Sequence, residues 1–287
     1  MKKVLLFVVM VLLFWIIPQG CSSDDKVTTP EKVVIDDDTE DPVEEDEPKA
    51  LFNLFIVDAP GDYISVYVEV LGVNIIVDND TIPLDLIWAN ADQPGVEKLD
   101  LLEYTGGGYD VLIGEHAVPA GELSEIILVL GNENRVITAD GRTNSLTLTD
   151  DTKNGISIPF NYSFQEGELA TLTIDFDVDA SLSKVEGASR EFILDPQIRG
   201  FDNNSTGHIY GYLASGLGAN PARLTVEAGD ITYSTQTYDN EFMLWGLPPG
   251  NHDLTFSFSE ASGIDDLVVN DIEVVAGENT SIGPLDH

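Results

Sequence analysis

The sequence has few basic residues, one cysteine and few histidines, and each shortage excludes a class of protein. Its 287 residues hold 13 Lys and Arg against 51 Asp and Glu, which gives a formal net charge of −38. A surface this acidic repels phosphate, so we expect no nucleic-acid partner. The single cysteine, Cys21, rules out an intramolecular disulfide and a cysteine-ligated metal site. The four histidines lie far apart, without the spacing of a zinc site.

The motifs of common catalytic sites are also missing. There is no Gly-x-Ser-x-Gly nucleophile elbow, no phosphate-binding Walker loop and no His-Glu-x-x-His zinc motif. Carboxylates are so frequent that many pairs could imitate an acid/base pair, which makes any one pair uninformative. We therefore predict that the protein is not an enzyme. A hydrolase that uses surface carboxylates is the least favoured alternative.

The first 20 residues have the pattern of a signal peptide. The apolar run from Val4 to Ile17 has 14 residues, whereas a bilayer-spanning helix takes about 20. Two lysines precede it, as in a secretory signal peptide. Pro18-Gln19-Gly20-Cys21 then resembles a bacterial lipoprotein lipobox, although other residues are commoner at its first two positions. The resemblance implies that residues 1–20 are cleaved and that Cys21 is lipidated. The alternative is an ordinary signal peptide that leaves a spare thiol.

The segment that follows is strongly acidic. Residues 22–49 contain 12 acidic residues, three lysines and no aromatic residue. Such a segment repels itself and stays extended, so residues 21–49 are predicted to be a lipidated cysteine followed by a disordered tether. Ser22-Ser23-Asp24-Asp25 resembles the export signal by which some Gram-negative bacteria send lipoproteins to the cell surface. This resemblance implies an outer-membrane location with surface exposure, and the membrane as partner through the lipid anchor.

From Leu51 onward, apolar and polar residues alternate in short runs between turn signals. Two such runs are Ile64 to Val70 and Leu172 to Val178. Because successive side chains of a strand point to opposite faces, the alternation predicts half-buried strands. Turn signals such as Asp78-Asn79-Asp80 separate the runs, and no long amphipathic helix is expected. The predicted fold class is all-β, with two consecutive antiparallel β-sandwich domains. A polar stretch after residue 201 places them at 50–201 and 206–287.

Both predicted domains resemble known families. Asp58-Ala59-Pro60-Gly61-Asp62, Pro119-Ala120-Gly121 and Asp175-Phe176-Asp177 carry the first resemblance, to a bacterial lipoprotein family known only as a domain of unknown function. It covers roughly residues 51–200 and implies an extracytoplasmic β-sandwich without a stated activity. Gly207 to Gly211 and Phe242 to Gly250 carry the second, over residues 206–287.

This second resemblance is to carboxypeptidase-regulatory, transthyretin-like domains. It implies a small Greek-key sandwich of the carbohydrate-binding-like type, which often accompanies surface proteins. Glu241 and His252 depart from that pattern. They leave the fold intact but put a carried-over ligand site in doubt.

Four acids have the spacing of a calcium loop: Asp175, Asp177, Asp179 and Glu186. They fall at positions one, three, five and twelve of such a loop. However, Ala180 occupies the sixth position, where the loop needs glycine, and the acids alternate with apolar residues as on the outer face of a strand. A different calcium site could combine them with Asp58 and Asp62. Structural calcium is the one cofactor that the sequence suggests, and these alternatives stay open.

Alternation also predicts an exposed aromatic face in the second domain, made of His208, Tyr210, Tyr212 and Trp245. This arrangement follows if Ile209, Gly211 and Leu213 point inward. Flat rings beside carboxylates and amides suit the C–H faces and hydroxyls of sugars. The alternative is that the rings pack on the first domain or on the opposite sheet. Weaker candidates in the first domain are Trp88, Tyr104 and Tyr109.

The prediction that combines these features is a non-enzymatic cell-surface lipoprotein that works in carbohydrate binding or adhesion. A structural or assembly accessory protein with no small ligand, and a calcium-stabilised adhesin, are the alternatives. The expected partners are the membrane and a glycan or surface protein. Asp80-Thr81-Ile82 also resembles a short O-glycosylation sequence of some Gram-negative bacteria.

Overall fold

The computed structural model describes residues 49–59, 61–87, 97–187, 190–214, 217 and 222–286. Strands make up 67% of these residues and helices 5%, which confirms the prediction of an all-β protein. The described residues all belong to one compact unit. Among them, no helix is long and apolar enough to cross a membrane. The predicted signal peptide, Cys21 and the tether up to residue 48 lie outside the described residues.

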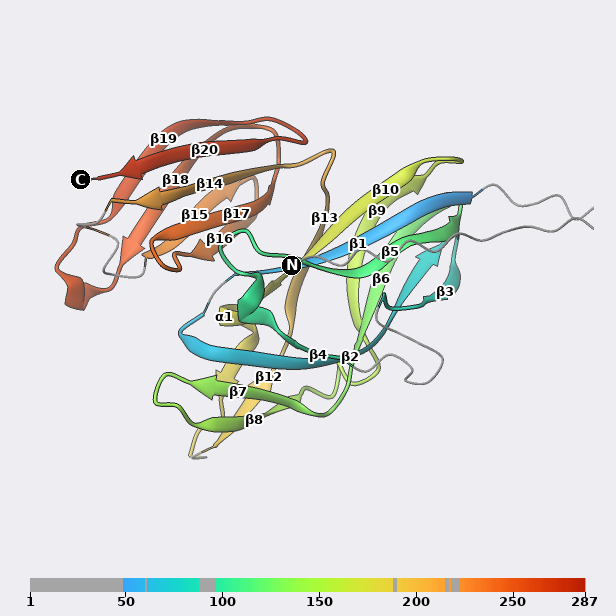
Figure 1. Ribbon diagram of the computed structural model, residues 1–287, viewed down its shortest axis with the longest axis horizontal. Coiled ribbons are helices and arrows are strands. Elements are labelled where there is room, and N and C mark those ends of the chain that lie inside the picture. Colours follow the sequence, from blue (N-terminus) through green and yellow to red (C-terminus); the bar gives the residue numbers. More distant parts are fainter. Residues whose placement is uncertain are drawn as a thin grey trace, which may run out of the picture. The chain divides into compact units, whose positions relative to one another are not determined.

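Sheet I has four strands in the order β13–β10–β1–β5. The bounds are β1 Lys49–Ala59, β5 Asp110–Pro119, β10 Leu169–Asp177 and β13 Gln197–Asp202. Strand β1 lies inside the sheet, between β10 and β5 (Figure 1). It is parallel to β10 and antiparallel to β5. The sheets are mainly antiparallel, as predicted, but β1 and β10 are parallel. Two later pairs are parallel as well: β8 (Thr143–Leu148) with β12 (Glu191–Leu194), and β14 (Gly207–Leu213) with β20 (Asn279–Leu285).

Sheet II has nine strands around the long β2, Tyr63–Val77. Seven strands follow the order β11–β12–β8–β7–β2–β6–β9, and β3 and β4 also pair with β2. The β2–β3 hairpin turns at Asp78 and Asn79, which have φ of 50° and 72°, so this predicted turn is confirmed. The other strands are β3 Asp80–Leu84, β4 Glu97–Asp100, β6 Gly121–Leu130, β7 Asn134–Thr138, β8 Thr143–Leu148, β9 Ile156–Phe164, β11 Leu182–Lys184 and β12 Glu191–Leu194.

The first hydrophobic core draws its side chains from both sheets, because alternation sends one side of each strand inward. From sheet I, Leu54 and Ile56 are fully buried, and from β2 the predicted inward residues Val66, Val68 and Val70 are fully buried as well. Burial of a side chain of this kind contributes about 1.5–3 kcal/mol. A shift of one residue in either strand would expose the whole set, so the core also holds the register.

In the part of the chain that the structure describes, three short helices interrupt the strands: η1 Leu101–Tyr104, α1 Val178–Ser181 and η2 Glu260–Ser262. Strand β10 ends at Asp177, where the sequence alternation continues to Val178 and beyond. The reason is a helix cap: Asp177 Oδ1 accepts a hydrogen bond from Ala180 N at 2.9 Å. Asp100 Oδ1 accepts from Leu102 N in the same way and begins η1.

Two further sheets follow residues 203–206. Sheet III has the order β17–β14–β20 and sheet IV the order β16–β15–β18–β19. The bounds are β14 Gly207–Leu213, β15 Ala222–Ala228, β16 Ile231–Gln236, β17 Glu241–Leu247, β18 Gly250–Phe258, β19 Leu267–Val274 and β20 Asn279–Leu285. They enclose a second, separate hydrophobic core. We call sheets I and II the first sandwich and sheets III and IV the second. That each is an independent domain stays a prediction.

Strand β14 is oriented as the sequence predicts. Ile209 and Leu213 are 0% and 2% exposed, and Gly211 between them is also buried. A Cβ added to Gly211 would lie 2.0 Å from the Ile282 carbonyl oxygen, so only glycine lets β20 approach this closely. The opposite side of β14, with its tyrosines, therefore forms the outer face of sheet III.

Candidate functional site

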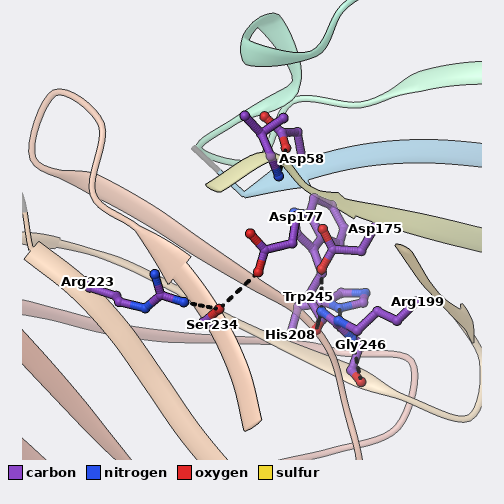
Figure 2. Close-up of polar contacts among 10 residues, drawn as sticks. Asp58, Asp175, Asp177, Arg199, His208, Arg223, Ser234, Trp245 and Gly246 are labelled. Carbon is purple, nitrogen blue, oxygen red and sulfur yellow. Dashed lines mark hydrogen bonds and ion pairs between the residues drawn. The ribbon is translucent and has the colours of Figure 1, made fainter. Parts of the chain in front are cut away.

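Polar residues gather where the two sandwiches meet, with Arg199 of β13 at the centre (Figure 2). Arg199 Nη2 donates to Asp175 Oδ2 at 2.5 Å and to the Trp245 carbonyl oxygen at 2.6 Å. Its Nη1 donates to the Gly246 carbonyl oxygen at 3.4 Å. The guanidinium carbon also lies 4.8 Å from the ring centre of Tyr233, within cation–π range. One arginine thus holds a carboxylate of the first sandwich and two carbonyls of the second.

The ion pair of Arg199 explains the position of Asp175. This side chain lies on the outer face of sheet I but is only 5% exposed. The expectation that Asp175 belongs to a solvent-facing acidic strand face is wrong, because Arg199 and the second sandwich cover it. Burial raises the pKa of Asp175, and the guanidinium opposes that rise. Its Oδ1 is buried without a hydrogen-bond partner.

Asp58 is a second buried carboxyl, at the end of β1. It is 2% exposed, and its Oδ1 accepts a hydrogen bond from Val178 N at 3.3 Å. Its Oδ2 is buried with no partner. Burial, reinforced by the negative charge of Asp175, raises the pKa of Asp58 well above its usual value. The carboxyl group therefore keeps its proton to a higher pH than an exposed aspartate does.

Three of the predicted calcium-binding acids do come together, around a cavity of about 140 Å³: Asp62, Asp177 and Asp179. The cation in contact with them is Arg223 of β15, whose Nη1 lies 2.7 Å from Asp179 Oδ2. Ser234 accepts a hydrogen bond from Arg223 and donates one to Asp177, each at 3.3 Å (Figure 2). Glu186 is exposed in the turn after β11 and does not line this cavity.

The arrangement of these carboxylates differs from a calcium loop because α1 replaces the loop backbone. Within the part of the chain that the structure describes, no group of three or more acids, histidines or cysteines is placed to hold a metal ion. Asp175 and Asp179 each have an arginine as counter-ion instead. Calcium at these acids stays a prediction.

The predicted aromatic face is divided in two. Tyr210 and Tyr212 are 41% and 50% exposed on the outer face of sheet III. His208 begins the same side of the strand but is 6% exposed, so its predicted place on an open face is wrong. The rings of Trp245 and Phe201 cover it, with centroids 4.7 and 5.8 Å away.

The buried His208 holds the neighbouring strand. Its Nδ1 accepts a hydrogen bond from Gly246 N at 3.0 Å, which requires the neutral ring with its proton on Nε2. Burial lowers the pKa of His208 to about 4, and the positive charge of Arg199 adds to the effect. Trp245 is half-buried beside it, and its Nε1 is buried without a partner. His208 and Trp245 thus pack against each other at the junction of the sandwiches and do not extend the open face of Tyr210 and Tyr212.

The weaker aromatic candidates lie apart from that face. Tyr104 in η1 donates its hydroxyl to Asp110 Oδ2 at 2.9 Å. Tyr109 is 59% exposed, and its ring meets the ring of Phe55 edge to face at 5.2 Å. Trp88 lies outside the described residues.

A groove of about 660 Å³ also opens at the junction, and sequence reasoning missed it. Its first-sandwich wall comes from the start of β2 and from η1, and its second-sandwich wall is Tyr238. The lining residues are Gly61, Tyr63, Ile64, Ser65, Asp100, Leu102, Glu103, Thr105 and Tyr238. No local pattern could reveal it, because the walls are more than 130 residues apart in the chain.

Comparison with protein families supports the first resemblance seen in the sequence. Residues 49–196 match the model of a family described as "Domain of unknown function (DUF4382)". This range contains the strands from β1 to β12. No curated protein matches the chain.

Solved structures resemble the chain only weakly. The Bacillus anthracis TIE protein is 13% identical with a TM-score of 0.19, over 82% of this chain and 33% of that one. A fimbrial protein from Bacteroides ovatus is 7% identical with a TM-score of 0.21, over 82% and 48%. The major pilin T-13 of Streptococcus pyogenes is 8% identical with a TM-score of 0.17, over 82% and 94%. The chain thus spans about a third of the TIE protein's length.

Proposed function

The chain belongs to the DUF4382 family, whose description assigns no activity, and we propose that it is a non-enzymatic cell-surface module that binds carbohydrate. The observation that carries this proposal is the pair of exposed rings on β14. Tyr210 and Tyr212 alternate along one strand and so stand about 7 Å apart on one face. Two flat rings on an open sheet offer stacking surfaces for successive sugar units.

Polar neighbours complete this tyrosine face. In the ladder, Tyr212 pairs with Glu241 of β17, and Tyr210 pairs with Ser281 of β20. Both partners are exposed. A carboxylate accepts hydrogen bonds from sugar hydroxyls, and a serine hydroxyl both donates and accepts them. The face therefore supplies apolar stacking and hydrogen bonds side by side.

The charge of the protein limits which glycans suit it. With a net charge of −38, the protein surface repels negatively charged polymers such as sulfated and uronic-acid polysaccharides. Neutral polysaccharides are free of this repulsion. We therefore propose a neutral glycan as the ligand.

The predicted signal peptide, the lipidation site Cys21 and the acidic tether support display of the module at the outer surface. Replacement of Cys21 by serine should move the protein from the membrane fraction to the soluble fraction. Protease treatment of intact cells should remove the wild-type protein from their surface. Protein that survives this treatment on intact cells but not on lysed cells would contradict surface display.

Binding is tested on an array of neutral, amino and acidic glycans with the purified chain. Replacement of both Tyr210 and Tyr212 by alanine should weaken binding to the recognised neutral glycan at least tenfold. Tyr109→Ala removes a more exposed ring of the first sandwich, away from the tyrosine face, and should bind normally as the control. An array without any bound glycan would overturn the proposal. Release of new reducing ends from a bound glycan would overturn its non-enzymatic part.

A further inference from the structure

We propose that the groove at the junction of the sandwiches is a second glycan subsite, and that it holds the same neutral chain that crosses Tyr210 and Tyr212. This inference rests on the proposed function and deepens it, because it places part of the ligand between the sandwiches. The residues that would contact the sugar are Tyr63, Ile64, Asp100, Glu103, Thr105 and Tyr238.

Large apolar side chains stand open in the groove beside its polar groups. Tyr238 is 59% exposed and Ile64 is 54% exposed, although both are large side chains. Tyr63 is half-buried, and its ring meets the ring of Phe192 edge to face at 6.4 Å. That packing fixes Tyr63 as a rigid wall. A sugar unit between two such walls could present an apolar C–H face to each.

Hydrogen-bonding groups line the same groove. Asp100 Oδ1 already accepts from Val66 N at 3.0 Å and from Leu102 N at 3.4 Å. Both bonds use the same oxygen, so the second oxygen of this fixed carboxylate is left for a ligand hydroxyl. Glu103 is exposed in η1, where it can accept further hydroxyl protons. Thr105 Oγ1 donates to the Leu102 carbonyl oxygen at 3.0 Å and keeps its lone pairs for a ligand.

A short connection links the groove to the tyrosine face. Tyr238 and Glu241 exchange two backbone hydrogen bonds, of 2.8 and 2.9 Å. Glu241 in turn pairs with Tyr212 across the β14–β17 ladder. Glu241 is therefore the one residue that lies between Tyr238 and Tyr212 across the strands. A glycan of several units can contact both places at once, and each contact then raises the effective concentration for the other.

The lining also indicates the chemical class of the ligand. None of the nine lining residues is basic, and two are carboxylates, which disfavours an acidic polysaccharide. A lysine-rich peptide would satisfy the two charges, but it would leave the rings of Tyr63 and Tyr238 without flat partners. Rings, hydroxyl groups and hydrogen-bond acceptors together suit a polyhydroxylated neutral chain.

The test measures binding of cellohexaose, xylohexaose, mannohexaose and maltohexaose to the purified chain by calorimetry. The expected result is that one hexaose binds, that Tyr238→Ala weakens its affinity at least tenfold, and that Glu103→Gln weakens it several-fold. Tyr238→Phe keeps the ring and should bind like the wild type. Tyr109→Ala is the control for loss of an exposed ring, and thermal melting checks that every variant is folded.

The two proposals fail in different ways. If a hexaose binds and depends on Tyr210 and Tyr212 but not on Tyr238 or Glu103, the groove inference is overturned and the proposed function stands. If no hexaose binds and the glycan array is also empty, both are overturned. If an oligolysine peptide binds in a way that depends on Tyr238 while the hexaoses do not, the ligand class is wrong.

Discussion

The Nη2 of Arg199 lies 2.6 Å from the carbonyl oxygen of Trp245, and this hydrogen bond joins the last strand of the first sandwich to a strand of the second. The same nitrogen binds the buried Asp175. Arg223 of the second sandwich makes an ion pair with Asp179 of the first. The two arginines differ mainly in exposure. The side chains of the Arg199 pair are 28% and 7% exposed, whereas those of the Arg223 pair are 48% and 47% exposed.

Replacement of Arg199 by methionine should lower the free energy of unfolding by about 3 kcal/mol, because it leaves the carboxylate of Asp175 buried and unpaired. Arg223→Met is the matched control and should cost less than about 1 kcal/mol, since water screens an exposed pair. Urea denaturation of both variants measures the difference. Equal costs would show that burial of the Arg199 pair has no energetic consequence.

His208 should make the protein sensitive to mild acid. Its folded-state pKa of about 4 lies below the ordinary value of 6.5, so the unfolded chain takes up a proton first. The contribution of the neutral His208 to the free energy of unfolding is complete above pH 6.5 and is lost as the pH falls toward 4. His208→Asn keeps an acceptor for Gly246 N but cannot titrate. The stability lost between pH 7 and pH 4 should be smaller in this variant by about 2 kcal/mol, which allows for residual solvent at the ring.

Thermal or urea unfolding at a series of pH values measures the effect of His208. His116→Asn, at a partly exposed position of β5, controls for the loss of a histidine as such. Parallel pH profiles for the wild type and His208→Asn would contradict the assignment of His208 as a neutral hydrogen-bond acceptor.

Asp58 should have the opposite effect from His208 on how stability depends on pH. Because its pKa is raised in the folded state, the folded protein holds a proton that the unfolded chain releases above about pH 4. Stability from this group is therefore lost as the pH rises from about 4 through the raised pKa. Asp58→Asn removes the ionisation and should flatten this part of the profile. Asp62→Asn, at an exposed position nearby, is the matched control for replacing an aspartate as such.

Calcium binding can be tested through Arg223. This side chain is the only basic one among the residues that line the cavity with Asp62, Asp177 and Asp179. In Arg223→Ala the three carboxylates lose that cation, so millimolar calcium should raise the melting temperature of the variant more than that of the wild type. The comparison is melting in calcium against melting in chelator. If calcium changes the melting temperature of neither protein, the calcium prediction is wrong.

Local alternation predicted the strands and most of their inward residues, although Ile64 at the start of the first run is 54% exposed. Val66, Val68 and Val70 in β2, and Ile209 and Leu213 in β14, are buried as the period of two requires. The Asp78-Asn79 turn was also predictable, because Asn and Asp tolerate positive φ. Each of these features depends on neighbours within a few residues.

The features that the sequence did not reveal depend on distant segments. Asp175 and His208 follow the alternation of their strands, but the side that should face water faces the other sandwich instead. The parallel pairing of β1 with β10 joins residues that are more than 100 positions apart. Tyr238 became a site candidate only when the fold brought it to the same groove as Tyr63.

The place of β1 in sheet I has a mechanical consequence. Any tension that reaches the described chain from residue 48 enters at Lys49, the first residue of a strand that is bonded along both edges. A strand at the border of the sheet could be peeled away from a single neighbour. To extract β1, a pull must break the ladders to β5 and β10 together and open the hydrophobic core that Phe52, Leu54 and Ile56 fill. A module fixed at its N-terminal end and pulled by its ligand would thus bear the load on a strand that is hydrogen-bonded along both edges.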